Sequence, residues 1–172
     1  MKQTIIRGLF LTTLALTSVS CKDDLEYGPL VRDNRPAVPV TFSNATTFGG
    51  NPFINVSTAA NTPITFTLSI PAGSGRTIRE ITTVVGGGTG VNAGSLNSAS
   101  AKFNPAPIPG TGTTATFATT LAAFAAKYPA PGVIITPMAN LATPREIAFI
   151  FLVTLDDNTQ IVTQQVRVRV LA

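Results

Sequence analysis

The chain has 172 residues, with 12 lysines and arginines, 8 aspartates and glutamates, one cysteine and no histidine. The net charge of +4 reflects sparse charges rather than a basic face, so the composition does not indicate nucleic-acid binding. The lack of histidine excludes Ser-His-Asp and Cys-His catalysis and histidine metal sites.

Residues 1–20 follow the pattern of a secretory signal peptide. Lys2 and Arg7 supply a positive start, residues 8–16 form an apolar run, and residues 17–20 have small or short side chains. The apolar run is too short to cross a bilayer, which needs about 20 apolar residues. Removal of this leader would leave 12 − 2 = 10 basic residues and all 8 acidic ones, a net charge of +2.

The single cysteine directly follows this leader, in the sequence Thr17-Ser18-Val19-Ser20-Cys21. The arrangement resembles the lipobox of bacterial lipoproteins, although Ser18 stands where leucine is usual. The resemblance implies cleavage before Cys21 and acylation of its sulfur and α-amine, which would anchor the protein on a membrane. The alternative is an ordinary signal peptide cut near Ser20, which would leave a reactive free thiol.

The next three residues, Lys22, Asp23 and Asp24, resemble the surface-export signal of lipoproteins from the Bacteroidota. This resemblance implies an outer-membrane lipoprotein that faces the cell exterior. The alternative is a solvated, charged tether. We therefore predict a signal peptide at 1–20, a lipidated tether at 21–36 and a β-domain at 37–172.

The body of the chain is rich in short segments of strand-like alternation. Pro39 confines the first predicted strand to a sheet edge, and a bulge is expected in the fourth because Ile78 and Ile81 break the alternation. The strand at 145–155 is apolar on both faces and is predicted to be central. The predicted strands are 37–42, 52–57, 63–70, 76–85, 113–119, 133–135, 145–155 and 159–170, with weak pairing at 95–103.

One segment changes to helical spacing. Leu121, Phe124 and Tyr128 recur at the spacing of one helix face, with Thr119 or Thr120 as N-cap. Seven or eight short strands, hairpins and one short connecting helix predict an all-β, immunoglobulin-like two-sheet β-sandwich. The body is similar, in pattern alone, to immunoglobulin-like bacterial surface modules, but it lacks the disulfide and core tryptophan of antibody domains.

Few residues suggest chemistry. Glu80 and Glu146 are the only conceivable carboxylate pair for glycoside hydrolysis, and solvated strand positions are the favoured interpretation. Asp156 and Asp157, next to Asn158, could offer oxygens to calcium, but aspartate is common in turns for backbone reasons. No catalytic residue, metal site or cofactor is therefore predicted.

Arg167 and Arg169 share one face of the last strand and could meet an anionic glycan, or else be solvated or paired with Glu146. With Asp156 and Asp157 they are the candidate binding residues.

The loops 86–94 and 104–112 are predicted contact surfaces. We expect a non-enzymatic surface lipoprotein that contacts another protein, such as an outer-membrane complex, by resemblance to accessory lipoproteins of glycan importers. The alternatives are a glycan-binding or adhesive module and, less favoured, a hydrolase.

Overall fold

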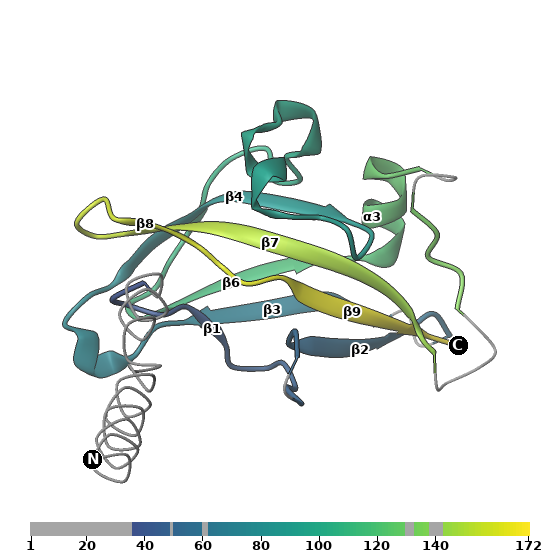
Figure 1. Cartoon of the computed structure of the whole chain (residues 1–172), viewed down its shortest axis with the longest axis horizontal. Helices are drawn as coiled ribbons and strands as arrows, with labels where there is room; N and C mark the ends of the chain where they lie inside the picture. The colour runs from purple at the N-terminus through teal and green to yellow at the C-terminus, as the bar shows by residue number, and fades with distance from the viewer. Residues whose placement is uncertain (1–35, 49, 60–61, 130–132, 138–142) are drawn as a thin grey trace, which may run out of the picture. The chain divides into compact units, whose positions relative to one another are not determined.

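A computed structural model describes residues 36–172, apart from residues 49, 60–61, 130–132 and 138–142. Within these residues nine β-strands form two sheets (Figure 1). Sheet A has the order β1-β3-β6, and sheet B has the order β2-β9-β7-β4-β5, with β8 also paired to β7. The chain is therefore an all-β domain of two sheets, as predicted. Val38–Ala172 form one compact unit.

The bounds of the strands are as follows. Sheet A contains β1 (Thr41–Phe42), β3 (Ile64–Ser69) and β6 (Thr114–Thr119). Sheet B contains β2 (Phe53–Ser57), β4 (Ile78–Gly87), β5 (Ile108–Pro109), β7 (Arg145–Leu155), β8 (Gln160–Val162) and β9 (Val166–Leu171). Pairing is antiparallel except between β2 and β9, which run parallel.

The core lies between the sheets and is built by strand alternation. Every second residue is buried in both β3 and β9. As predicted, β7 is buried on both faces along most of its length, and it lies between β4 and β9. Burial of each large apolar side chain stabilises the fold by about 1.5–3 kcal/mol. The largest buried side chains include Phe66, Phe124, Phe149, Phe151, Ile64 and Leu68.

Helix α3 (Leu121–Lys127) follows β6 directly and closes one side of this core. The Thr120 hydroxyl accepts a hydrogen bond from the Ala123 N–H at 3.1 Å, which confirms Thr120 as the N-cap. The fully buried ring of Phe124 lies 5.3 Å, centroid to centroid, from the ring of Phe149 on β7. Leu121 and Tyr128, partly buried, pack against the same core, so the helix contacts it through the face that the predicted spacing indicated.

The end of the helix is fastened to sheet B by Tyr128. Its hydroxyl donates to the Ala101 carbonyl oxygen at 2.7 Å and accepts from the Gly86 N–H at 2.9 Å. Burial raises the pKa of the Tyr128 hydroxyl above its ordinary value, and the hydrogen bond from Gly86 opposes that rise. The hydroxyl therefore satisfies two backbone groups that no strand partner reaches.

Strand β4 departs from the prediction at its end. The register shifts between Ile78 and Glu80 and between Ile81 and Thr83, which confirms the expected irregularity. However, the predicted loop from residue 86 to 94 is wrong at its start, because Gly86 and Gly87 belong to β4. A Cβ at Gly86 would lie 2.9 Å from a ring carbon of Phe124 and 3.0 Å from one of Tyr128. Glycine is thus needed here for ring packing rather than for a turn.

The connection after β4 is also ordered differently from the prediction. Two 3₁₀ helices form, η2 (Ala93–Asn97) and η3 (Ala99–Ala101), and η2 contacts both β4 and β7. The weak pairing predicted over 95–103 is limited to the end of this segment, where Lys102 forms an isolated antiparallel bridge with Val85. The segment that follows is fixed by buried Asn104. Its side-chain oxygen accepts from the Val84 N–H at 2.7 Å, and its amide donates to the carbonyls of Thr82 and Ala106.

One further predicted strand is wrong, and another is confirmed only in part. Residues 133–135 form no strand, and Val133 and Ile135 instead pack against the core as partly buried side chains. The predicted strand 159–170 is divided into β8 and β9. The division occurs where the buried Thr163 hydroxyl accepts a hydrogen bond from the Phe151 N–H at 3.1 Å. A side chain there replaces a backbone partner and interrupts the ladder.

Candidate functional site

The residues predicted to carry lipid and export information lie outside the described part of the chain. These are Cys21, Lys22, Asp23 and Asp24, together with the signal peptide and most of the tether. Among the described residues, no helix is long and apolar enough to cross a membrane.

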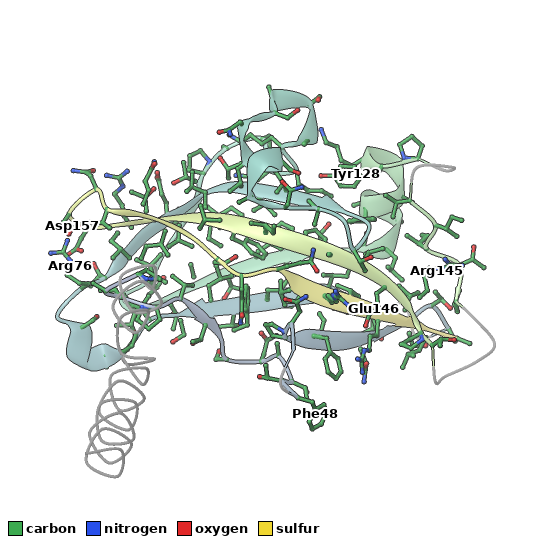
Figure 2. All side chains as sticks on the ribbon, in the orientation of Figure 1. Phe48, Arg76, Tyr128, Arg145, Glu146 and Asp157 are labelled. Atoms are coloured by element: carbon green, nitrogen blue, oxygen red, sulfur yellow. The ribbon has the colours of Figure 1, made fainter. Side chains whose placement is uncertain are left out.

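The structure places the acidic turn against an arginine. Arg76 Nε lies 3.0 Å from Asp156 Oδ1, and Arg76 Nη2 forms an ion pair with Asp157 (Figure 2). Asp157 also accepts a hydrogen bond from the Thr159 N–H at 2.9 Å, as aspartates in turns do. Both carboxylates are thus occupied within the fold. In the described ranges, no group of three or more histidine, cysteine, aspartate or glutamate residues could hold a metal ion.

The two glutamates of the conceivable catalytic pair are far apart. Glu80 on β4 is in register with Thr154 on β7, whereas Glu146 lies 154 − 146 = 8 positions earlier on that strand. Eight residues of extended chain span about 26 Å. Glycoside hydrolysis by two carboxylates needs a separation of roughly 5–9.5 Å. The structure does not bring this pair together.

Arg167 and Arg169 lie together with Glu146 on the outer face of sheet B. Arg167 Nη1 is 2.6 Å from Glu146 Oε2, and Arg169 Nε is 3.0 Å from Glu146 Oε1. The arrangement follows from strand alternation, because Val166 and Val168 of the same strand point into the core. One carboxylate therefore bridges two arginines, which is one of the alternatives that the sequence left open.

Two phenylalanines extend this cluster beyond the charged residues. The Arg169 guanidinium carbon lies 3.5 Å from the centroid of the Phe53 ring, within the range of a cation–π contact. The Phe53 ring in turn lies 6.1 Å from that of Phe48, whose side chain is 82% exposed (Figure 2). We call Phe48, Phe53, Glu146, Arg167 and Arg169 the Phe48–Arg169 patch.

The border of the patch is fixed by Gln165. Its side-chain oxygen accepts from Arg167 Nε at 3.0 Å and from the Asn51 amide at 3.2 Å. Its amide donates to the carbonyl oxygens of Thr89 and Val91 at 3.0 and 2.8 Å. The predicted glycine-rich contact loop is therefore attached to the patch at these two residues.

Sequence reasoning found the arginines but missed the aromatic half of the patch. Phe53 pairs with Arg167 only because β2 runs parallel to β9 across more than 100 positions of chain. Phe48 lies in a predicted loop, where a single phenylalanine carries no periodic signal. An exposed aromatic residue in a loop was the one sign that could have been noticed.

The patch retains capacity to bind an anion. Glu146 neutralises one of the two arginines, which leaves a net charge of +1. Arg167 Nη2 and both terminal nitrogens of Arg169 have no hydrogen-bond partner within the described structure. Arginine donors in this geometry bind carboxylate, sulfate or phosphate oxygens, often in pairs. The side chains of Arg167 and Arg169 are 31% and 35% exposed, so a ligand can reach them.

Comparisons with known proteins found no matching family model, no matching curated protein and no matching solved structure.

Proposed function

We propose that this protein is a surface lipoprotein of the outer membrane whose immunoglobulin-like domain binds another protein through the Phe48–Arg169 patch. The membrane part of the proposal rests on the lipobox-like Cys21 and the export-like Lys22, Asp23 and Asp24. Acyl chains on Cys21 would hold the domain at the membrane without a spanning helix, since each buried methylene contributes about 0.8 kcal/mol.

Strand order supports the immunoglobulin-like assignment. In that fold one sheet contains strands A, B, E and D and the other contains G, F, C and, in some members, C′. The order β1-β3-β6 fits A-B-E, and the order β9-β7-β4-β5 fits G-F-C-C′. The chain departs from the fold in having no strand D between β5 and β6 among the described residues, and in placing α3 between E and F.

The observation that carries the binding proposal is the exposure of Phe48, whose ring lies beside Phe53, the residue on which Arg169 stacks. Protein interfaces are enriched in aromatic residues and arginine at their centres and are polar at the rim. The patch has this composition, with Phe48 and Phe53 beside two arginines and with Gln165 and Asn51 at its border. Its net positive charge favours a partner that presents acidic side chains. A component of an outer-membrane complex is the partner that we propose.

Site-specific crosslinking in intact cells tests this proposal. A photo-crosslinking residue at position 48 is expected to capture a discrete partner, and the adduct is expected to disappear when Arg169 is changed to alanine. Position 162 is the matched control, because Val162 on β8 is also an exposed apolar residue, 45% exposed, and lies outside the patch. Equal capture from both positions, or persistence of the adduct without Arg169, would show that the patch is not the contact surface.

The surface location is tested separately by protease treatment of intact cells. The native protein is expected to be cut, and a variant with alanines at Lys22, Asp23 and Asp24 is expected to be protected. If both are protected, the protein faces the periplasm and the export assignment is wrong.

A glycan ligand is the second candidate, and the unpaired arginine nitrogens favour an acidic sugar over a neutral one. Isothermal titration of the purified protein with uronic-acid and sulfated oligosaccharides would measure this directly. Saturable binding that is lost in Arg167→Ala would favour the glycan, whereas no heat with either sugar would exclude it.

A further inference from the structure

Four of the five sheet edges formed by the described strands carry a feature that limits further strand pairing, and one of them, β8, has only three residues. β1 and β5 are each two residues long, with Pro39 shortly before β1 and Pro109 within β5. β2 is covered at both ends, because Thr46 exchanges backbone hydrogen bonds with Phe53 and the Thr62 N–H donates to the Ser57 carbonyl. Short edges, proline and local covering are the usual protections of sheet edges.

The remaining edge, β6, is covered only at its start, where Thr111 and Thr114 exchange backbone hydrogen bonds. Its six residues contain no proline and no charge and are rich in threonine. It pairs with β3 along its whole length, from Ile64 with Thr119 to Ser69 with Thr114. Its other side has no strand partner in the described part of the chain. An uncharged, β-prone edge of this length is a template for pairing with another strand.

The backbone groups that face outward on β6 can be identified from the register. The Ile70 N–H donates to the Thr113 carbonyl, so hydrogen-bonded pairs alternate from that point along the ladder. This alternation turns the N–H and C=O groups of Thr116 and Ala118 away from β3. The hydrogen bonds of Thr67, the residue of β3 opposite Thr116, support this assignment. Its carbonyl accepts from the Ser43 N–H and its N–H donates to the Asn44 side chain, so both groups point away from β6.

We propose that β6 pairs antiparallel with β6 of a second copy of this chain. A two-fold axis at Phe117 places Thr116 opposite Ala118 of the second copy, and Ala118 opposite its Thr116. The outward groups of these two residues then form about four hydrogen bonds and leave none unused. The two three-stranded sheets become one continuous sheet.

Charge favours a second copy over an unrelated charged strand. No residue of β1, β3 or β6 is charged, so two copies meet along this edge without like-charge repulsion in spite of the chain's net charge of +4. The Phe48–Arg169 patch involves β2, β7 and β9 of the other sheet, so dimerisation would leave it accessible.

Cysteine crosslinking of the full chain tests the proposed register, in a Cys21→Ser background so that no other thiol reacts. Thr116→Cys and Ala118→Cys place thiols on exposed positions of the same face. Across the axis, positions 116 and 118 would have Cα atoms about 5.5 Å apart, within the range of roughly 4.4–6.8 Å for a disulfide. Equal positions of the two copies would lie diagonally, about 7–8 Å apart.

Under mild oxidation, a mixture of the two single variants is therefore expected to form a disulfide-linked heterodimer, and each variant alone to remain largely unlinked. If the mixture stays unlinked, or if each variant alone links as efficiently as the mixture, the proposed pairing is wrong.

Sedimentation equilibrium of the same full chain provides a second measurement. Thr116→Pro removes an outward N–H without removing a bond to β3, and it is expected to weaken dimerisation by roughly tenfold or more, since two hydrogen bonds are lost per dimer. Thr116→Val keeps the backbone donor and is the matched control, expected to dimerise as the parent does. A monomer at micromolar concentration in the parent, or equal dimerisation of Thr116→Pro and Thr116→Val, would overturn the proposal.

Discussion

Substitution of Gly86 by alanine should destabilise the domain by overpacking. Gly86 lies near the end of β4, where rings from α3 and β7 cover it. An added Cβ would lie 2.9 Å from Phe124 Cε2, 3.0 Å from Tyr128 Cε2 and 3.2 Å from Phe149 Cε1. These contacts are too short for carbon atoms, whose optimal separation is about 3.5–4.0 Å. Phe124 and Phe149 are fully buried, so neither ring can move without disturbing the core.

The expected loss combines two opposing contributions. Insertion of a methyl group into a packed core costs about 1–3 kcal/mol. Replacement of glycine within a strand recovers about 0.5–1 kcal/mol, because glycine loses more conformational freedom on folding. The net prediction is therefore a fall of about 0.5–2 kcal/mol in the free energy of unfolding. The hydrogen bond from the Gly86 N–H to the Tyr128 hydroxyl is expected to lengthen as well.

Urea denaturation measures this loss as a lower midpoint with an unchanged slope. Gly88→Ala is the matched control, because nothing lies within 4 Å of a Cβ built there, and its free energy of unfolding is expected to change by about 0.5 kcal/mol or less. A smaller side chain at position 124 should relieve the clash, so Gly86→Ala should cost less in a Phe124→Leu background. The reasoning is refuted if Gly86→Ala and Gly88→Ala have the same midpoint, or if Gly86→Ala costs the same in both backgrounds.

Three further predictions concern single residues. Because the pKa of Tyr128 is raised in the folded state, the unfolded chain loses this proton first as pH rises. The contribution to stability is therefore complete below the ordinary pKa of 10.0 and is lost as pH rises through the higher folded value. Urea midpoints measured over a pH series should show a weaker alkaline decline in Tyr128→Phe, and an identical decline in both proteins would contradict this prediction. Gly110→Ala should lower the free energy of unfolding by about 3 kcal/mol or more, since its Cβ would lie 2.1 Å from the Ile78 carbonyl oxygen. A melting temperature close to that of the parent would contradict this prediction. Glu146→Gln should lower stability by about 1 kcal/mol, because two neighbouring arginines lose their shared carboxylate, and the loss should shrink in high salt; a loss independent of salt would point to packing instead of charge.

The local features of this fold were readable from the sequence because they depend on near neighbours. Strict alternation fixed the inward face of β3, and an apolar run on both faces marked β7 as central. The change of period at Leu121, preceded by Thr120, located α3 and its cap. Spacing along a strand or helix decides these properties before any tertiary contact forms.

The tertiary structure decided which distant residues meet, because those contacts depend on strand order. Phe53 reaches Arg169 only through the parallel pairing of β2 with β9, and Phe48 follows from a loop. The sequence predicts Gly86 as part of the loop 86–94, since its glycine neighbours are locally indistinguishable from it. Only the rings of Phe124 and Tyr128 show that it is a packing position. Sequence alone determines each residue's chemistry and local geometry. The residues that it contacts in the fold can lie more than 100 positions away along the chain.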